Sequence, residues 1–366
     1  MFEELLSLPT CWEQLKKTQK PIVMYGMGNG ADHILSYFDA FGIEVAEFFA
    51  SDAFVRGHSF HGKRVKKLSE IEETYDDFVI VTAFAVQDAP TMDYIYGLAD
   101  RYELYAPDVP VAGENLFDRD FLREHLTKAE AAFALLADEE SRRVYRDLLA
   151  YKLTGDVRYL KSTESPRQAA FDTILRLGQT ESYVDLGAYN GDTIEEFLQQ
   201  TGGEFSAIRA MEPDEKNHRK ALARMENLGL GDDARVDIRN LAAWEEKTVL
   251  HFAAKAGRNS AVAAKKEQKV REIPADSVDN LVGKNPVSYI KMDVEGSEKE
   301  AILGSANAIR RHHPKMMLSA YHRSEDLWAL PLQIARICPG YRFYLRRFPY
   351  IPAWEINYIC LWEDAR

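Results

Sequence analysis

Short apolar runs alternate with amphipathic stretches along most of the chain, and this alternation predicts α/β structure built on parallel sheets. An apolar run that begins at Pro21 leads into a glycine-rich turn, a stretch with helical spacing of its apolar residues, and a second apolar run. That order predicts a strand, a helix and a second strand. Another strand is expected at 78–82, and a proline-rich stretch after it ends the region. We therefore predict a first α/β domain over residues 1–112.

The middle of the chain, residues 113–165, has few strand-like runs and predicts a connector of helices, broken near Gly155 and Pro166. Alternation of short strands and helices resumes over residues 166–366. The last two apolar runs have no helix-length gap between them, so they predict an antiparallel hairpin at the sheet edge. The second domain is thus expected to be a doubly wound sheet, parallel except at this edge.

Acidic residues outnumber basic ones, 58 to 46, and the formal net charge of −12 argues against binding of nucleic acid or of anionic membranes. The expected partner is therefore a small molecule. Three cysteines without metal-ligand spacing favour a reducing cytosol over a disulfide framework. The first residues lack the pattern of a secretory signal, and the most apolar run, 78–86, is about half as long as a membrane span. We expect a cytoplasmic protein that does not insert into a membrane.

The segment 183–193, YVDLGAYNGDT, predicts a strand that ends in an acid, a glycine turn and the start of a helix. Glycines at 187 and 191 would let a ligand approach the backbone closely. The next strand ends at Glu212, and an acid at such a tip typically binds ribose hydroxyls. Two other interpretations stay open: a tight turn without a ligand, and an acid that the helix dipole favours at a helix start.

Two further strand ends carry candidate site residues. Small residues lead to Trp244 in the segment 240–244, which suits a wall against a flat adenine, although packing in the core is the commoner role of a tryptophan. Farther along, the side chains of Lys291, Asp293 and Glu295 share one face of an extended stretch. Three charges where an ordinary buried strand is apolar indicate a functional site.

Four segments, VDLGAYNGDT, AMEPD, YIKMDVEGSE with EAILGSANAI behind it, and LSAYHRSEDLWALP, resemble in order and spacing the successive motifs of FkbM-type methyltransferases. The resemblance covers residues 165–366. It implies a class I methyltransferase fold and S-adenosyl-L-methionine as the methyl donor. It also implies O-methylation of a hydroxyl on a sugar, glycan or secondary metabolite, so the expected acceptor is a small molecule or a carbohydrate.

Carried over to this chain, the resemblance implies donor-binding and catalytic residues. The donor-binding set is Asp185, Gly187, Ala188, Gly191, Glu212, Ala242 and Asp293. Asp293, Glu295 and His322 would face the acceptor as the catalytic set. His322 is a candidate base because the unperturbed pKa of histidine lies near physiological pH; a carboxylate base is the second alternative, and a mainly positional mechanism is the third. The glycine loop varies among family members at Tyr189 and Asn190, so no role is assigned to those side chains.

Asp293, Glu295 and His322 could instead hold a divalent cation that orients a diol, since carboxylates suit magnesium. The spacing of the three residues does not require a metal. The sequence therefore predicts no metal site.

In the first domain, Gly26, Gly28 and Ala31 follow a strand and Asp52 follows the next one, which fits the outline of a dinucleotide fingerprint. The domain also resembles the small Rossmann-like domains that precede sugar-modifying enzymes. Three roles stay open for it: a structural or dimerising role in a homodimer, binding of a sugar nucleotide, and binding of a nicotinamide cofactor. The last would make the protein an oxidoreductase. The leading prediction is an S-adenosylmethionine-dependent methyltransferase. A nicotinamide-dependent oxidoreductase and a non-catalytic nucleotide-binding protein are the two alternatives.

Overall fold

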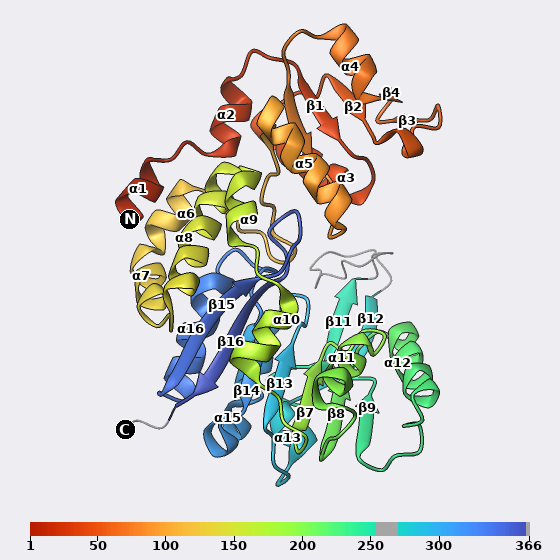
Figure 1. Ribbon diagram of the computed structural model, residues 1–366, viewed down its shortest axis with the longest axis vertical. Helices are drawn as coiled ribbons and strands as arrows, with labels where there is room; N and C mark the ends of the chain where they lie inside the picture. Colours follow the sequence, from red (N-terminus) through yellow and green to blue (C-terminus); the bar gives the residue numbers. More distant parts are fainter. Residues whose placement is uncertain (254–269, 364–366) are drawn as a thin grey trace.

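The computed structural model describes residues 1–253 and 270–363, in which two α/β domains are joined by a group of helices (Figure 1). The N-terminal domain lies at the top of Figure 1, the helical connector at the left, and the C-terminal domain at the bottom. Among the described residues, no helix is both long and apolar enough to span a membrane.

The N-terminal domain is built on a six-stranded sheet that is parallel apart from one short edge strand. Its strands, in the spatial order β3-β4-β2-β1-β5-β6, are β1 (Ile22–Tyr25), β2 (Glu47–Phe49), β3 (Ser59–Phe60), β4 (Lys63–Lys66), β5 (Val79–Thr82) and β6 (Glu103–Tyr105). Its helices are α1 (Phe2–Ser7), α2 (Cys11–Lys17), α3 (Asn29–Phe41), the one-turn η1 (Asp52–Phe54), α4 (Leu68–Thr74) and α5 (Ala89–Arg101). Every residue of β1 and β5 is buried, because their two faces pack in two different cores. The expected strand, helix and strand are β1, α3 and β2, and the two strands pair in parallel.

The connector begins with α6 (Arg119–Glu124) and continues through α7 (Leu126–Ala134), α8 (Glu139–Thr154), α9 (Val157–Thr163), α10 (Arg167–Ala170) and the π-helical turn η2 (Phe171–Leu175). Asp138 starts α8 by accepting a hydrogen bond from the backbone N–H of Ser141. Gly155 ends α8 in the left-handed conformation, with φ 65°, and Pro166 precedes α10. The predicted breaks near Gly155 and Pro166 are therefore confirmed.

The C-terminal domain is a doubly wound sheet, seven-stranded over the described residues, with an antiparallel pair at one edge. Its strands, in the spatial order β15-β16-β14-β13-β7-β8-β9, are β7 (Ser182–Leu186), β8 (Ala207–Met211), β9 (Val236–Arg239), β13 (Tyr289–Met292), β14 (Lys315–Ser319), β15 (Tyr341–Arg347) and β16 (Ile356–Trp362). Its helices are α11 (Asp192–Thr201), α12 (Glu215–Asn227), α13 (Val278–Val282), α14 (Glu298–Leu303), α15 (Ala306–His312) and α16 (Asp326–Ile337). Strands β7, β8, β9, β13 and β14 run parallel, whereas β16 is antiparallel to both β14 and β15. The predicted fold class and its edge hairpin are confirmed.

A small second sheet in the C-terminal domain was not predicted from the sequence. It consists of β10 (Ala242–Ala243), β11 (Thr248–Ala253) and β12 (Val270–Asp276), in the order β10-β12-β11. Strand β10 has only two residues, and β12 carries a proline and several charges. Strand β10 is therefore too short to show the apolar periodicity by which strands are recognised in a sequence, and in β12 the alternation is limited to two apolar residues, Ile273 and Ala275.

Backbone hydrogen bonds at two places hold the N-terminal domain against loops of the C-terminal domain. Val86, after β5, exchanges two backbone hydrogen bonds with Ile351 in the loop between β15 and β16. Farther along the chain, the N–H of Ala112 donates to the carbonyl oxygen of His322, at 2.8 Å. The chain that leaves the N-terminal domain therefore lies against the loop that follows β14.

Candidate functional site

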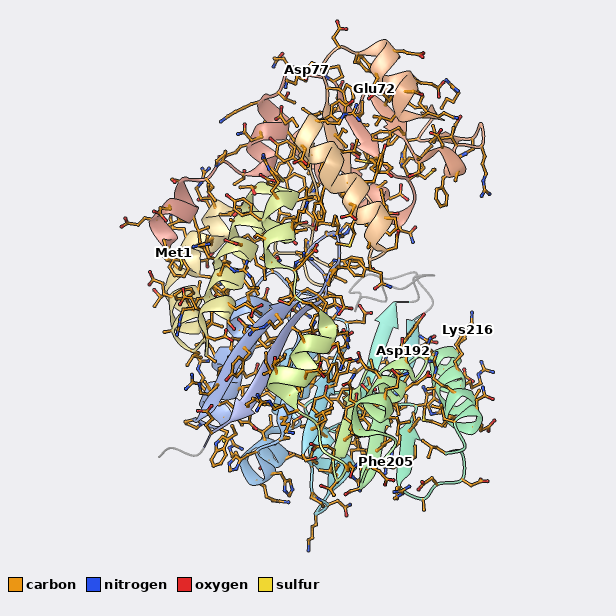
Figure 2. All side chains as sticks on the ribbon, in the orientation of Figure 1. Met1, Glu72, Asp77, Asp192, Phe205 and Lys216 are labelled. Carbon is orange, nitrogen blue, oxygen red and sulfur yellow. The ribbon has the colours of Figure 1, made fainter. Side chains whose placement is uncertain are left out.

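The parallel strands of the C-terminal sheet end on the side that faces the N-terminal domain. In Figure 2, Asp192 and Lys216, in the first turns of the helices that follow β7 and β8, lie on that side, and Phe205, which precedes β8, lies on the opposite side. Ligands of open parallel sheets bind beyond the carboxyl ends of the strands. The candidate residues after β7, β8, β13 and β14 therefore lie together at the carboxyl ends of the parallel strands.

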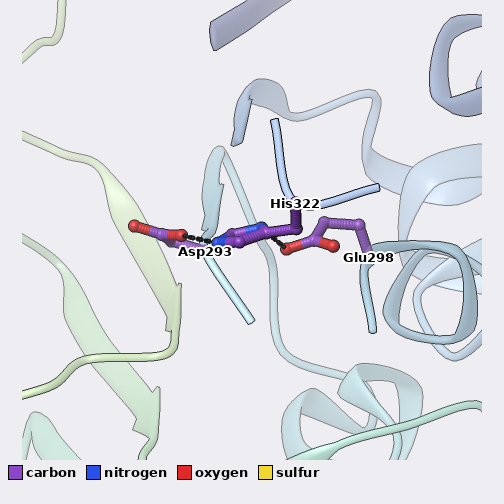
Figure 3. Close-up of side chains that lie close together, drawn as sticks. All are labelled: Asp293, Glu298 and His322. Carbon is purple, nitrogen blue, oxygen red and sulfur yellow. Dashed lines mark ion pairs between the residues drawn. The ribbon is translucent and has the colours of Figure 1, made fainter. Parts of the chain in front are cut away.

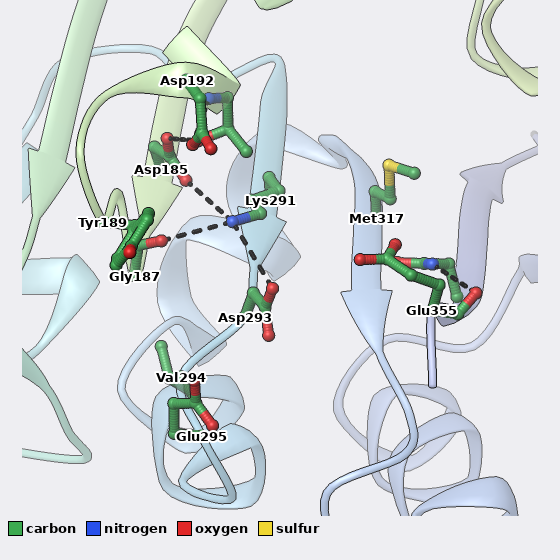
Figure 4. Close-up of polar contacts among 12 residues, drawn as sticks. Asp185, Gly187, Tyr189, Asp192, Lys291, Asp293, Val294, Glu295, Met317 and Glu355 are labelled. Atoms are coloured by element: carbon green, nitrogen blue, oxygen red, sulfur yellow. Dashed lines mark hydrogen bonds and ion pairs between the residues drawn. The ribbon is translucent and has the colours of Figure 1, made fainter. Parts of the chain in front are cut away.

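Asp185 and Lys291 lie side by side on β7 and β13, which pair in parallel with these two residues in register (Figure 4). Asp185 is fully buried, accepts a hydrogen bond from the hydroxyl of Thr193, and has its Oδ1 3.6 Å from Lys291 Nζ. Burial raises the pKa of Asp185, and the charge of Lys291 opposes this rise. Burial also disfavours the charge of Lys291, but Asp185 and Asp293 raise its pKa above the ordinary value. The two residues form a buried ion pair in which each charge depends on the other.

The glycine loop after β7 is shaped by the close approach of β7 to the chain that follows β13. Gly187 has φ 80°, and a Cβ placed on it would lie 1.9 Å from the carbonyl oxygen of Asp293. Any side chain at this position would clash with backbone. Lys291 Nζ donates a hydrogen bond of 3.3 Å to the carbonyl of Gly187 and so ties the loop to β13. The backbone alone therefore requires Gly187, a reason that the sequence did not reveal.

Glu212 is a buried carboxylate that holds the glycine loop. Its side chain is 5% exposed, and its two oxygens accept backbone N–H groups from Tyr189, at 2.7 Å, and from Asp214, at 2.8 Å. Burial raises the pKa of Glu212 to about 7, although both backbone hydrogen bonds act to lower it. The predicted ribose-binding acid thus links the end of β8 to the loop after β7.

The remaining donor-binding candidates surround the same loop and the second sheet. Ala188 is fully buried, and Gly191, with φ 82°, starts α11 where a Cβ would lie 3.3 Å from Ala221. Ala242 is buried in β10. Trp244 packs against the small core of the second sheet. This contact supports the core-packing alternative for Trp244, and a role for Ala242 beside adenine stays a prediction.

Asp293, Glu295 and His322 are brought together at the ends of β13 and β14, as predicted. His322 is fully buried, and its Nε2 lies 3.4 Å from Asp293 Oδ1 and 3.5 Å from Glu295 Oε2. Its other ring nitrogen, Nδ1, lies 2.9 Å from Glu298 Oε1 (Figure 3). The hydroxyl of Tyr321 donates to Asp293 Oδ1 at 3.3 Å. One imidazole is thus surrounded by three carboxylates.

These carboxylates change the titration of the histidine. Burial lowers the pKa of His322, but Glu298, Asp293 and Glu295 together raise it to about 10. Burial opposes the charge of Asp293, yet Lys291 and His322 hold its pKa below the ordinary value. Burial raises the pKa of Glu295, against the attraction of His322. At neutral pH His322 therefore carries a proton, and the ordinary histidine pKa that favoured it as a base does not apply in these surroundings.

Three residues of this region were missed as site residues. Glu298 belongs to one of the motifs, but the sequence assigned it no role. Its side chain is 1% exposed and contacts the ring of His322. Tyr321 contacts Asp293, as described above. Glu355, in the loop between β15 and β16, lies 3.3 Å from Arg167 Nη1, and its raised pKa is due first to burial. The acid-rich stretch after β13 pointed to Glu298, whereas the sequence around Glu355 has no pattern that indicates a site.

The backbone is strained at several positions in this region. Tyr189, Glu295 and Glu355 have φ of 48°, 53° and 57°, in the left-handed region that disfavours residues other than glycine. Such conformations cost free energy and persist where the surrounding structure imposes them, often at functional sites. These three residues lie in the glycine loop, after β13 and in the β15–β16 loop, and His61, Arg176 and His313 elsewhere in the chain also have positive φ.

The sheet order, with acids at the ends of β7, β8 and β13, defines a class I methyltransferase domain. Residues 185–346 match the family model described as "Methyltransferase FkbM domain". Residues 185–346 therefore match a methyltransferase domain of the FkbM family, as the motifs of this segment predicted. Among curated proteins, none matches the sequence.

One solved structure resembles more of the chain than the family model covers. The methyltransferase FkbM from Methylobacillus flagellatus KT superposes with a TM-score of 0.70 at 21% identity, over 93% of this chain and 90% of that one. An rRNA methylase from Streptococcus thermophilus gives 0.38 at 13% identity, over 55% and 98%. A SAM-dependent methyltransferase from Thiobacillus denitrificans in complex with S-adenosyl-L-homocysteine gives 0.27 at 13% identity, over 43% and 49%. The first shows a shared fold that includes the N-terminal domain, and the TM-scores of the other two are too low to carry an argument.

Proposed function

We propose that this chain transfers the methyl group of S-adenosyl-L-methionine to a hydroxyl oxygen of a carbohydrate or a glycosylated small molecule. The observation that carries the proposal is the row of charges Asp185, Lys291 and Asp293, of which the first two are buried and Asp293 is partly exposed (Figure 4). This row joins the glycine loop after β7 to the carboxylates around His322. A donor at the loop and an acceptor at the carboxylates would thus lie beyond neighbouring strand ends, which suits direct transfer between them.

The donor end fits the chemistry of the cofactor. Each carboxylate oxygen of Glu212 accepts one backbone N–H, and a carboxylate can accept further hydrogen bonds, so it can also take hydroxyls of a ribose. Gly187 and Ala188 would line the donor through their backbone. When bound, S-adenosyl-L-methionine supplies a methyl group on a positively charged sulfur. Asp185 and Lys291 hold the loop in place.

The acceptor end offers groups that can take a proton. A neutral hydroxyl must lose its proton as its oxygen is methylated, and a base within hydrogen-bond reach assists this loss. Glu295 is the most exposed of the three catalytic candidates, and the partial burial of its carboxyl raises its pKa above the ordinary value. We assign the proton to Glu295 or Asp293. His322, protonated and buried between the carboxylates, positions them.

Aromatic side chains beside these carboxylates favour a carbohydrate acceptor. The rings of Tyr321 and Trp354 are 6.4 Å apart between centroids, and those of Tyr350 and Trp354 are 5.4 Å apart. All three side chains are partly exposed. A sugar ring combines apolar C–H faces with hydroxyl edges, so it matches an aromatic surface next to carboxylates. This match is the support for the substrate class.

Two observations support two of the roles that are open for the N-terminal domain. A surface pocket of about 360 Å³ lies at the ends of β1 and β2 and the start of α5, with Tyr25, Phe49 and Tyr94 among its lining residues. Its position and aromatic lining support binding of a sugar nucleotide. The Val86–Ile351 pairing supports a structural role, in which the domain positions the β15–β16 loop. Both roles remain compatible with methyl transfer.

The test of the proposed function starts with ligand binding. Thermal unfolding is followed with S-adenosyl-L-homocysteine, nicotinamide cofactors and sugar nucleotides, because a ligand that binds only the native state raises the melting temperature. We expect stabilisation by S-adenosyl-L-homocysteine and none by nicotinamide cofactors. Transfer of labelled methyl groups to a panel of glycosides then tests the acceptor class. A shift with nicotinamide cofactors and none with the donor product would overturn the assignment.

A further inference from the structure

Glu355 is a carboxylate of the β15–β16 loop to which the proposed methyl transfer gives no role. Its oxygen Oε2 lies 3.3 Å from Nη1 of Arg167, and its side chain is 31% exposed. Burial raises the pKa of Glu355; the charge of Arg167 opposes this rise, and the charge of Asp293 adds to it. The carboxyl group of Glu355 therefore lies close enough to Asp293 to respond to its charge.

The sheet places Asp293 and Glu355 on the two sides of β14. Asp293 directly follows β13, Glu355 directly precedes β16, and β14 lies between these two strands. Ser319, the last residue of β14, is in register with Asn357, so β16 begins where β13 and β14 end. Because neighbouring strands lie about 4.8 Å apart, about 10 Å separates the ends of β13 and β16. In Figure 4 the carboxylate of Glu355 points toward Lys291 and Asp293.

Two aromatic side chains connect the two carboxylates. The hydroxyl of Tyr321 donates to Asp293 Oδ1 at 3.3 Å, and the ring of Tyr321 lies 6.4 Å from the ring of Trp354, at an interplanar angle of 25°. Trp354 directly precedes Glu355 in the chain, and both aromatic side chains are partly exposed. This surface therefore offers apolar ring faces next to two groups that accept hydrogen bonds.

The loop that carries Glu355 is held in place by several contacts. The side-chain amide of Asn357 donates to the carbonyl oxygen of Glu355, at 2.9 Å, and Val86 of the N-terminal domain exchanges two backbone hydrogen bonds with Ile351. These contacts keep Glu355 in the left-handed region, with φ 57°, which costs free energy. A side chain that is fixed before a ligand arrives loses little conformational freedom on binding.

We propose that Glu355 is a further acceptor-binding residue, whose carboxylate accepts a hydrogen bond from a hydroxyl of the acceptor other than the one that is methylated. This inference rests on the proposed function. It narrows the acceptor to a sugar ring that presents one hydroxyl toward Asp293 and a second toward Glu355.

The chemistry of Glu355 suits selection among sugars. A carboxylate has about four positions for hydrogen-bond donors, so the contact with Arg167 leaves room for a hydroxyl. A hydrogen bond to a charged acceptor is about twice as strong as a neutral one. A site built to bind a hydroxyl also rejects an analogue that lacks it, because a polar group of the site is then left unpaired. Glu355 would therefore determine which sugars are accepted.

The experiment measures binding of the methyl glycosides of glucose, galactose, mannose and rhamnose to the full chain saturated with S-adenosyl-L-homocysteine, by saturation-transfer NMR. We expect at least one glycoside to bind. Glu355→Gln should weaken its binding about tenfold, because a neutral amide replaces a charged acceptor. Glu363→Gln is the matched control, because this acid also pairs with an arginine, Arg342, but follows the other end of β16.

Monodeoxy analogues of the bound glycoside separate direct binding from a structural role. The analogue that lacks the hydroxyl bound by Glu355 should bind to wild type about tenfold more weakly than the parent glycoside, and Glu355→Gln should not weaken it further. A structural defect would weaken the parent and every analogue alike. That uniform loss, or unchanged affinity for the parent glycoside in Glu355→Gln, would overturn the inference.

Binding of S-adenosyl-L-homocysteine to the same samples separates this inference from the proposed function. A Glu355→Gln variant that binds the donor product as wild type does is folded, so its loss of glycoside binding is a loss at the acceptor site. Wild type that binds the donor product and none of the glycosides would overturn both the carbohydrate acceptor and the role of Glu355, and leave the donor site standing. A glycoside that wild type and Glu355→Gln bind and methylate equally would support the proposed function and exclude Glu355 from the site.

Discussion

Replacement of Glu212 by glutamine should change how the stability of the protein depends on pH. Its pKa is about 7 in the folded chain, against an ordinary value of 4.5. Between these pH values the native state keeps a proton that the unfolded state has lost, so the contribution of Glu212 to stability is fully present below pH 4.5 and is lost as the pH rises through 7. The difference of about 2.5 pKa units corresponds to about 3 kcal/mol.

Glutamine does not titrate, so Glu212→Gln removes the pH dependence that the carboxyl contributes. The substitution also disturbs one of the two hydrogen bonds that the side chain accepts. Its carbonyl oxygen can accept one of the N–H groups of Tyr189 and Asp214, but its amide N–H₂ would face the other donor, at a cost of about 1 to 3 kcal/mol. Glu212→Gln should therefore be less stable than wild type at pH 4.5, and the difference should shrink or reverse by pH 8. Urea unfolding of both proteins at half-unit pH steps measures this. A difference that stays constant over the range would refute the reasoning.

Donor binding gives a second measure of the same residue. Hydroxyls that donate to the carboxylate favour its charged form, so S-adenosyl-L-homocysteine should bind more tightly as the pH rises toward 7 and release a proton below it. In Glu212→Gln the affinity should fall by about 1.5 to 3 kcal/mol and lose this pH dependence. Calorimetry in buffers of different ionisation enthalpy detects the proton. Equal affinity in a folded variant would restrict Glu212 to holding the glycine loop.

Substitutions at three other residues test the surroundings of the site. Lys291→Met should destabilise the chain by about 3 to 5 kcal/mol, because it leaves the buried charge of Asp185 unpaired, and Lys291→Arg should retain part of that stability; chemical unfolding compares them. Gly187→Ala should abolish donor binding or prevent folding, since its Cβ would lie 1.9 Å from the carbonyl oxygen of Asp293. A variant with unchanged donor affinity in calorimetry and an unchanged circular dichroism spectrum would contradict the clash. Arg347→Met should lower the melting temperature by several degrees, because the fully buried guanidinium donates to backbone carbonyls of both the connector and the β15–β16 loop; an unchanged temperature would contradict this.

Much of the fold was predictable because its signals are local. Several strands of the two main sheets, such as β1 and β5, are short apolar runs, and helix ends are marked by residues such as Asp138 and Gly155. Donor-binding candidates were predictable for the same reason, since Asp185 and Glu212 stand at or directly after strand ends. The strands β10 and β12 were missed because the apolar pattern of each is very short, and their pairing with neighbouring strands is visible only in the folded chain.

The sequence by itself determined which residues end each strand, and therefore that Asp185, Glu212, Asp293 and His322 would lie along one edge of a parallel sheet. Tertiary structure decided what those side chains do there. Glu298, the first residue of helix α14, contacts His322 from the turn after β13, and the carboxylates around the ring raise the pKa of that histidine to about 10. Such contacts join segments that are distant along the chain. Burial and charge depend on these neighbours in space, and the sequence around each residue does not contain them.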